Sequence, residues 1–141
     1  MTKFSNYVEA NIIESTLRGT VAPVPAGTFL ALCTADLTDA NITTNEVTVA
    51  AWPAYTRKDL AVGGVISSGW SANVNGVSSN AKVVAFPATN GASTVTVTHL
   101  GIYDALTGGN LLYHSPLTTS KSLLVGDVLS WGIGSIVVTI D

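Results

Sequence analysis

Apolar and polar residues alternate along much of the second half of the chain, at the spacing that is typical of half-buried β-strands. The run TVTVTH at residues 94–99 places its valines and threonines on opposite sides of such a strand. A glycine-rich reversal follows at residues 104–110, and NLLYH at residues 110–114 predicts a returning strand. The β-branched residues 136–140 predict a last strand. This half of the chain therefore predicts an antiparallel sheet.

The first half adds one helix and several shorter strands. Apolar residues recur at helical spacing within residues 5–18, where Ser5 suits the N-cap and Gly19 suits the stop. Further strands are expected at residues 28–34, 46–50, 54–61, 65–71 and 82–86, with polar turns or loops at residues 35–41, 63–64 and 76–80. No second helical pattern separates these strands, which excludes βαβ repeats.

We therefore expect a mainly β fold in a single domain that covers residues 1–141. About eight short strands at this spacing are typical of an antiparallel β-sandwich or jelly roll. The N-terminal amphipathic helix at residues 5–18 must lay its apolar side on either the sheet or a neighbouring subunit.

Charge is scarce in this chain. Charged residues make up 11% of it, against about 25% in a typical soluble domain, which indicates an obligate assembly because little self-repulsion keeps copies apart. The six basic residues are scattered and the net charge is −3, which argues against nucleic acid as a partner. The N-terminus has no signal-peptide pattern, and glycines and Asp127 interrupt the apolar residues 123–140. We expect a soluble protein without a membrane partner.

Candidate chemistry is sparse as well. His99 and His114 fall on neighbouring predicted strands, and with Asp104 they would suit zinc, but no closely spaced ligand pair accompanies them. Hydrogen-bonding or interface histidines are favoured instead. Asp36 and Asp39 supply only part of a calcium-loop series and are interpreted as turn formers. With no nucleophile elbow or phosphate loop in the sequence, we predict no catalytic, cofactor-binding or metal-ligating residue and no enzyme activity.

The lone cysteine and the tryptophans bear on packing. Cys33 alternates with apolar residues inside a predicted strand, so we interpret it as a buried small hydrophobe. Trp52, Trp70 and Trp131 could form an aromatic platform for a sugar or a partner protein. The alternative, which we favour, is one core tryptophan and two partly exposed ones. Trp70 is the best candidate for exposure because serines and a glycine surround it.

Nine short motifs lie in order along nearly the whole chain. They are FSNY at residues 4–7, ALCTAD at 31–36, NEV at 45–47, AYTR at 54–57, FPA at 86–88, VTHLGIYD at 97–104, TGGNLL at 107–112, LTTSK at 117–121 and GD at 126–127. Together they resemble a family of small tailed-phage virion proteins. That family has glycines before its Tyr-x-Arg segment, whereas residues 50–53 are AAWP here, which makes Trp52 a candidate contact residue. The resemblance implies a structural virion protein without catalytic residues.

The first hypothesis for function is a capsid decoration (cement) protein on the head surface of the virion, which binds and stabilises the assembled shell. Its expected partner is the major capsid protein or another virion protein, and a homo-oligomer, such as a trimer, is expected. The second hypothesis is a tail-fibre or minor tail protein, and the third is a β-sandwich hydrolase or carbohydrate-binding module. The expected contact segments are residues 5–18, 36–44 and 52–55. The expected contact residues are Tyr7, Ile12, Asp36, Asp39, Trp52, Tyr55 and Trp70.

Overall fold

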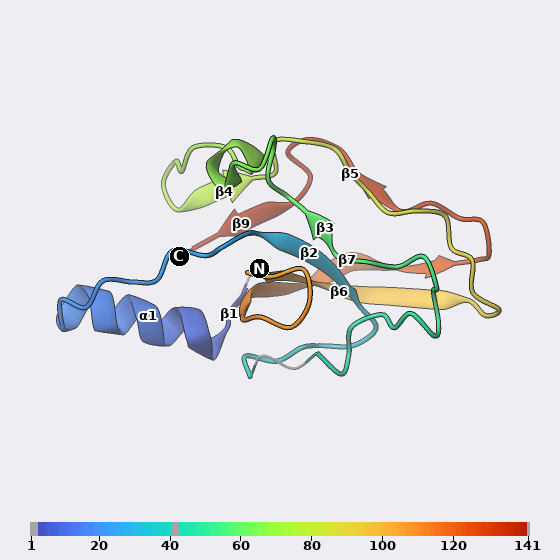
Figure 1. Cartoon of the computed structure of the whole chain (residues 1–141), viewed down its shortest axis with the longest axis horizontal. Coiled ribbons are helices and arrows are strands. Elements are labelled where there is room, and N and C mark those ends of the chain that lie inside the picture. The colour runs from blue at the N-terminus through green and yellow to red at the C-terminus, as the bar shows by residue number, and fades with distance from the viewer. Residues whose placement is uncertain (1–2, 41–42, 141) are drawn as a thin grey trace.

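The computed structural model of the protein describes residues 3–40 and 43–140, and these form two β layers with one helix at one end (Figure 1). The strands are β1 (Lys3–Phe4), β2 (Phe29–Cys33), β3 (Lys58–Asp59), β4 (Val77–Ser79), β5 (Val84–Ala85), β6 (Val95–Tyr103), β7 (Leu111–Leu123), β8 (Ser130–Trp131) and β9 (Val137–Thr139). The helices are α1 (Asn6–Leu17) and the short 3-10 helix η1 (Ile66–Gly69). The predicted mainly β antiparallel fold with one N-terminal helix is confirmed. That it forms a single domain stays a prediction.

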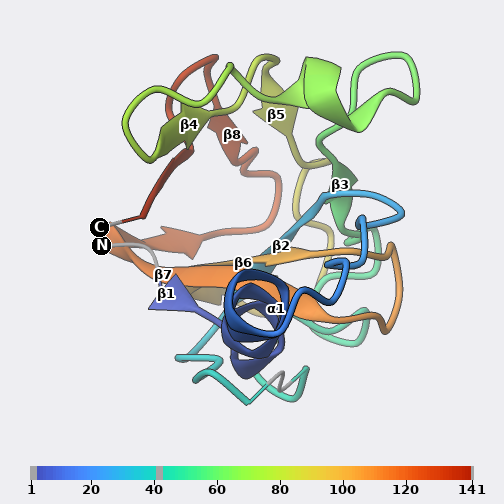
Figure 2. The same cartoon turned by 90° about the vertical axis from the view of Figure 1, so that its left-hand side faces the viewer.

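One layer is a five-stranded sheet in the order β1-β7-β6-β2-β3, and the other consists of two-stranded sheets, β4-β9 and β5-β8. Figure 2 shows the two layers edge-on, with α1 at the near end. The long hairpin of β6 and β7 pairs Val95 with Leu123 and Tyr103 with Leu111. Its reversal lies where the sequence predicts one, and the side chain of Asp104 accepts hydrogen bonds from the backbone and side-chain nitrogens of Asn110, at 2.6 and 2.8 Å.

The main core lies between the two layers. Leu32, Val97 and Ile102 face inward from the five-stranded sheet and belong to one buried cluster with Phe86 and Val138 from the facing layer. The valines that alternate with threonines in the sequence of β6 are thus the residues that face this core.

The opposite face of the five-stranded sheet is buried too. Ala31, Cys33 and Tyr103 cluster there with Leu37 from the loop after β2. Gly101 permits the close approach of this loop, because a Cβ at that position would lie 2.6 Å from Cδ1 of Leu37. The prediction that Cys33 is buried is confirmed.

The structure corrects the predicted strands at residues 46–50 and 54–61. Glu46 makes only an isolated bridge to Cys33, and residues 54–61 contain only the short β3. The backbone N–H groups of Ala51 and Trp52 donate to the carbonyl of Thr48 instead, at 3.1 and 2.9 Å. This local turn takes up the carbonyl of Thr48, an acceptor that a longer strand ladder at residues 46–50 would need.

The structure also corrects the predicted strand at residues 65–71 and the predicted loop at residues 76–80. The first contains η1, and the second contains β4, which pairs with β9. Asn75 and Gly76 both have positive φ, 51° and 78°, as in the type I′ turns that join hairpins. The Asn-Gly dipeptide was therefore a hairpin signal that the sequence interpretation missed.

Helix α1 begins and ends close to the predicted residues. The Oγ of Ser5 caps it by accepting from the backbone N–H of Val8 at 3.3 Å, and Gly19 follows it with φ of +70°. None of its residues is fully buried, although Tyr7 and Val8 pack partly against the main core. No helix in the described ranges is long and apolar enough to cross a membrane.

Candidate functional site

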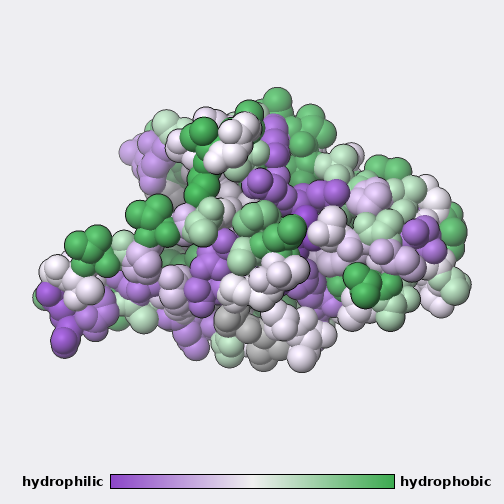
Figure 3. All heavy atoms as spheres, in the orientation of Figure 1, coloured by the Kyte–Doolittle hydropathy of each residue, from purple (hydrophilic) through white to green (hydrophobic). Residues whose placement is uncertain are grey.

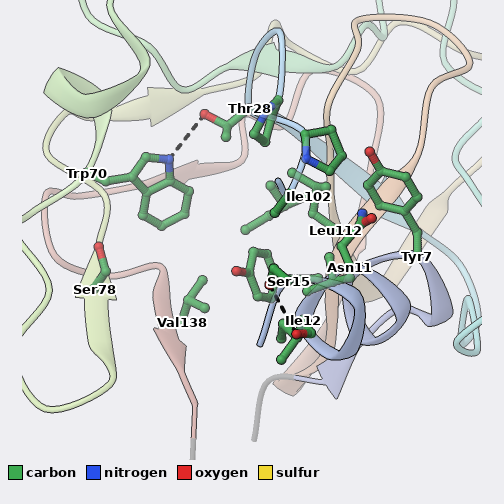
Figure 4. Close-up of a pocket in the computed structure, with 15 residues that line it drawn as sticks. Tyr7, Asn11, Ile12, Ser15, Thr28, Trp70, Ser78, Ile102, Leu112 and Val138 are labelled. Carbon is green, nitrogen blue, oxygen red and sulfur yellow. Dashed lines mark hydrogen bonds between the residues drawn. The ribbon is translucent and has the colours of Figure 1, made fainter. Parts of the chain in front are cut away.

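An apolar groove opens beside α1, at the end of the sandwich where the two layers part (Figure 4). Its volume is about 370 Å³. Tyr7 and Ile12 line it from the helix, Leu112 lines it from the five-stranded sheet, and Trp70 and Val138 line it from the facing layer. None of the residues that line the groove is charged. It can therefore accept an uncharged, apolar surface but offers no charged group for chemistry.

The indole of Trp70 is fixed on the wall of this groove. Its Nε1 donates to Oγ1 of Thr28 at 3.1 Å, which leaves the ring face toward the hollow (Figure 4). Thr28 is buried just before β2, so the contact joins the two layers. Trp70 and Trp131 are half-buried and Trp52 is fully buried, which confirms the favoured alternative of one core tryptophan and two partly exposed ones.

The seven predicted contact residues separate into three places. Tyr7, Ile12 and Trp70 come together in the groove, although 58 positions separate Ile12 from Trp70 in the sequence (70 − 12). Trp52 and Tyr55 lie in the main core, and this corrects their assignment as contact residues. The reason is aromatic packing, because Tyr55 stacks on the ring of Phe86 and Trp52 packs against the same ring at a tilt.

The two predicted aspartates, Asp36 and Asp39, bind a buried histidine on β7. The Nδ1 of His114 lies 3.2 Å from Oδ1 of Asp36, and its Nε2 lies 2.9 Å from Oδ1 of Asp39. An ionised carboxylate only accepts hydrogen bonds, so both contacts are hydrogen bonds at once only when both ring nitrogens carry protons. The aspartates therefore act as more than turn formers. Residues 41–42 of the predicted contact loop lie outside the described residues.

This histidine cluster also holds the base of α1. The backbone N–H of Asn6 donates to the carbonyl of Asp39 at 2.8 Å, and Nζ of Lys3 lies 3.6 Å from Oδ2 of Asp36. The pKa of Asp36 is lowered, chiefly by the hydrogen bond from the backbone N–H of Thr38, with Lys3 among the smaller causes. The cluster thus ties β1, α1 and the loop after β2 to one point on the sheet.

A second network of polar side chains, centred on Glu46, is buried in the fold. The carboxylate of Glu46 accepts from Nε and Nη2 of Arg57, at 2.9 and 2.7 Å, and from the hydroxyl of Tyr55 at 2.8 Å. The hydroxyl of Tyr55 in turn accepts from the backbone N–H of Leu32 at 3.0 Å. Burial raises the pKa of the Tyr55 phenol, so it stays a neutral donor. Glu46, Arg57 and Tyr55 therefore satisfy one another's hydrogen-bonding groups inside the fold.

The guanidinium of Arg57 extends this network to the reversal between β6 and β7. Its Nη1 donates to the carbonyls of Ala105 and Gly108, at 2.8 Å each, and its central carbon lies 3.6 Å from the ring centroid of Tyr103. Burial opposes the charge of Arg57, but the contact with Glu46 outweighs it and the pKa of Arg57 is raised. The sequence interpretation missed this role, although an arginine and a glutamate close together in a charge-poor chain were a signal for it.

No metal-holding cluster forms among the residues that the structure describes. No three histidine, cysteine or acidic side chains within 3–40 and 43–140 are placed to hold a metal ion together. Asp104, which could have joined the two histidines at zinc, binds Asn110. His99 contacts its neighbour Thr98, whose Oγ1 lies 2.8 Å from its Nδ1. The groove beside α1 is therefore the strongest candidate for a functional surface.

Comparison with known protein families decides the class of the protein. The family model described as Podophage GP4 fiber I protein gp80 matches residues 3–139. The chain belongs to this family. Membership in the gp80 family makes it a phage virion structural protein, and it confirms the resemblance that the nine sequence motifs carry. A search of curated proteins finds no match.

The structure brings together three of the sequence motifs that are distant in this chain. Glu46 of the NEV motif, Tyr55 and Arg57 of the AYTR motif, and the carbonyl of Gly108 in the TGGNLL motif form the one buried network. In this chain these motifs therefore hold the scaffold together. Position on the head surface stays a prediction.

Proposed function

We propose that this protein is a non-enzymatic structural component of a phage fibre. The observation that carries the proposal is the match to the podophage fiber I family, which covers residues 3–139 of the 141 in the chain. The family's printed name refers to a fibre, so we place the second of the three hypotheses ahead of capsid decoration. The role would be mechanical: a β scaffold that holds its place by contacts with neighbouring proteins.

The chemistry of the described residues supports a scaffold. The side chains that are best suited to catalysis are engaged in structural bonds, such as the pair of Glu46 and Arg57 and the histidine cluster around His114. Asp127 likewise accepts from the backbone N–H of Leu124 at 2.8 Å and so closes a turn. Several apolar side chains, such as Leu17 and Val128, are exposed on the outside, which suits contacts between subunits.

The test of this proposal is the position of the protein on intact particles. Virions labelled with antibody against the purified protein and gold conjugate are examined by electron microscopy. Gold on the tail fibres is the expected result, together with a copy number far below that of the major shell protein by quantitative gel analysis. Gold spread over the head, at a copy number close to that of the shell protein, would overturn the fibre role and favour capsid decoration.

A further inference from the structure

A second hollow, which we call the Trp131 cleft, lies between β7 of one layer and β8 and β9 of the other. It is lined by residues 113–118 of β7, by Trp131 of β8, and by Ser135 and the first residues of β9. Its volume is about 260 Å³. It shares three lining residues with the groove beside α1, but no residue of α1 lines it, and its tryptophan is Trp131 and not Trp70. The cleft is therefore a site of its own.

The Trp131 cleft combines apolar and hydroxyl groups. Leu100, Leu117 and Trp131 are half-buried in its lining and pack against the main core. Thr118 and Ser135 are exposed and supply hydroxyl groups. The end of the molecule with α1 differs, since Figure 3 shows hydrophobic residues standing out over the helix and the chain after it. An apolar lining with a few polar groups is typical of sites for small ligands.

The turn that carries Ser135 is held by a buried asparagine. Asn80 is 1% exposed, and its Nδ2 donates to the carbonyl of Gly132 at 2.8 Å. Its Oδ1 accepts from the backbone N–H of Ile136 at 2.8 Å, and its carbonyl accepts from that of Gly134 at 2.8 Å. Three bonds from one residue thus fix the chain between β8 and β9. A ligand that binds here does not have to order this turn first.

The ring of Trp131 is held as well, while polar groups around it stay available. Trp131 pairs with Val84 in the β5-β8 ribbon, and its ring meets that of Phe86 edge-on, with 6.2 Å between the centroids. The indole N–H of Trp131 and the hydroxyls of Thr118 and Ser135 have no hydrogen-bond partner among the residues that the structure describes. These groups can therefore bind a ligand without breaking a bond inside the fold.

The charge of the lining limits what the cleft can take. It contains no aspartate, glutamate, lysine or arginine within the described residues. His114 lies in the lining, but its two ring nitrogens are 3.2 and 2.9 Å from the carboxylates of Asp36 and Asp39 and so are already engaged. A charged ligand would lose its hydration without gaining a partner. The cleft therefore favours a neutral ligand with both an apolar face and hydrogen-bonding groups.

We propose that the Trp131 cleft binds one ring of a neutral saccharide. The apolar face of the sugar ring packs on Trp131 and the neighbouring leucines, and its hydroxyls bond to Thr118 and Ser135. At about 260 Å³ the cleft lies just below the usual range of small-molecule sites, about 300–1,000 Å³, so it accepts a single ring. The inference goes beyond the proposed function, because a structural fibre component need not bind a sugar.

The test uses the full chain labelled with ¹⁵N, whose three tryptophans give three indole N–H signals in nuclear magnetic resonance spectra. The variant Trp131→Phe assigns the signal of Trp131. The probes are glucose, galactose, mannose, rhamnose and N-acetylglucosamine, with glucuronic acid and glucosamine as charged rings of matched shape. We expect at least one neutral sugar to shift the Trp131 signal with a dissociation constant on the order of 1 mM, as a ligand of this size allows. The charged rings should bind more weakly.

Two neighbouring threonines of β7 give a matched pair of variants. Thr118 and Thr119 are both exposed, but only Thr118 lines the cleft. Thr118→Ala removes one hydrogen bond to the sugar and should raise the dissociation constant about 2- to 10-fold. Thr119→Ala should leave it unchanged. Neither change touches the core, so both variants should fold, and the positions of the other two indole signals check this.

Three results would overturn the proposal. One is the absence of any shift of the Trp131 signal with every neutral sugar at about 50 mM, well above the expected constant. Another is a shift of the Trp70 signal alone, which would place the sugar in the groove beside α1. The third is tighter binding of a charged ring, or equal weakening by the two threonine variants. None of these results bears on the fibre role, which is tested by labelling of virions.

Discussion

The buried pair of Glu46 and Arg57 gives the most direct test of which interactions stabilise this fold against unfolding. Arg57→Met keeps most of the aliphatic length of the side chain and removes its charge and donors. The carboxylate of Glu46 then stays in the fold without its ion pair, and the carbonyls of Ala105 and Gly108 lose their donor. The cost comes from the groups that are left behind, because a buried charge without a partner is strongly unfavourable.

The magnitude follows from the burial of the pair. The side chains of Arg57 and Glu46 are 3% and 14% exposed, so solvent screens the pair little. Breaking a buried pair on one side costs about 3–5 kcal/mol, which is a large part of the roughly 5–15 kcal/mol that stabilises a domain. At about 3–5 °C per kcal/mol for a chain of this size, the melting temperature should fall by roughly 10–25 °C. The double variant with Glu46→Gln should lose less than the sum of the single losses.

The assay is urea unfolding followed by tryptophan fluorescence, with the free energy of unfolding taken from the midpoint and slope. The chain supplies a matched control in Arg18→Met. Arg18 contacts Glu14 at 2.8 Å, nearly the same distance as the buried pair, but the two side chains are 70% and 45% exposed. This exposed pair should contribute less than about 1 kcal/mol. A loss below about 1 kcal/mol for Arg57→Met, or equal losses for the two variants, would refute the reasoning.

Three further predictions concern single residues. Burial raises the pKa of the Cys33 thiol to about 12. A thiol reagent at mildly alkaline pH should therefore label the protein only as urea unfolds it. Fast labelling of the native protein would contradict this prediction. Gly101→Ala should destabilise the fold by about 1–3 kcal/mol in thermal melts, since its Cβ would lie 2.6 Å from Leu37, whereas Gly132→Ala, whose nearest contact is 3.5 Å, should cost less. The lowered pKa of Asp36 means that this group stabilises the fold above its unfolded pKa of about 3.9 and that the contribution is lost as pH falls through the folded pKa. Asp36→Asn should therefore flatten the loss of stability below about pH 4, and an unchanged acid profile would show that the carboxylate does not contribute.

Local signals predicted the parts of the fold that local contacts decide. Ser5 marks the start of α1 because its Oγ accepts from the backbone N–H of Val8, and Gly19 marks the end because it adopts a positive φ of 70°. The reversal before Asn110 follows from turn chemistry. The burial of Trp52 could not be predicted in this way, because it depends on ring contacts with Phe86, 34 residues later (86 − 52). Alternation in residues 46–50 arises there without a strand, since Glu46 makes an isolated bridge to Cys33 and the N–H groups of Ala51 and Trp52 turn back to the carbonyl of Thr48.

The candidate site was predicted in part. Tyr7, Ile12 and Trp70 were chosen singly, as an amphipathic face and an aromatic residue among serines. Their meeting in one groove depends on how the β4-β9 ribbon and α1 are placed at the same end of the sandwich, which no short stretch of sequence encodes. The partner of the aspartates, His114, was missed for the same reason, since 75 positions separate it from Asp39 (114 − 39).

The hydrogen bond from Ser5 to Leu111 spans 106 positions of the chain. During synthesis the start of the polypeptide must therefore wait until most of it has left the ribosome before it can dock, and contacts over such separations form slowly. The end of the molecule that carries α1 is consequently completed last. A prematurely terminated product that lacks Leu111 cannot form this hydrogen bond, so its α1 stays undocked.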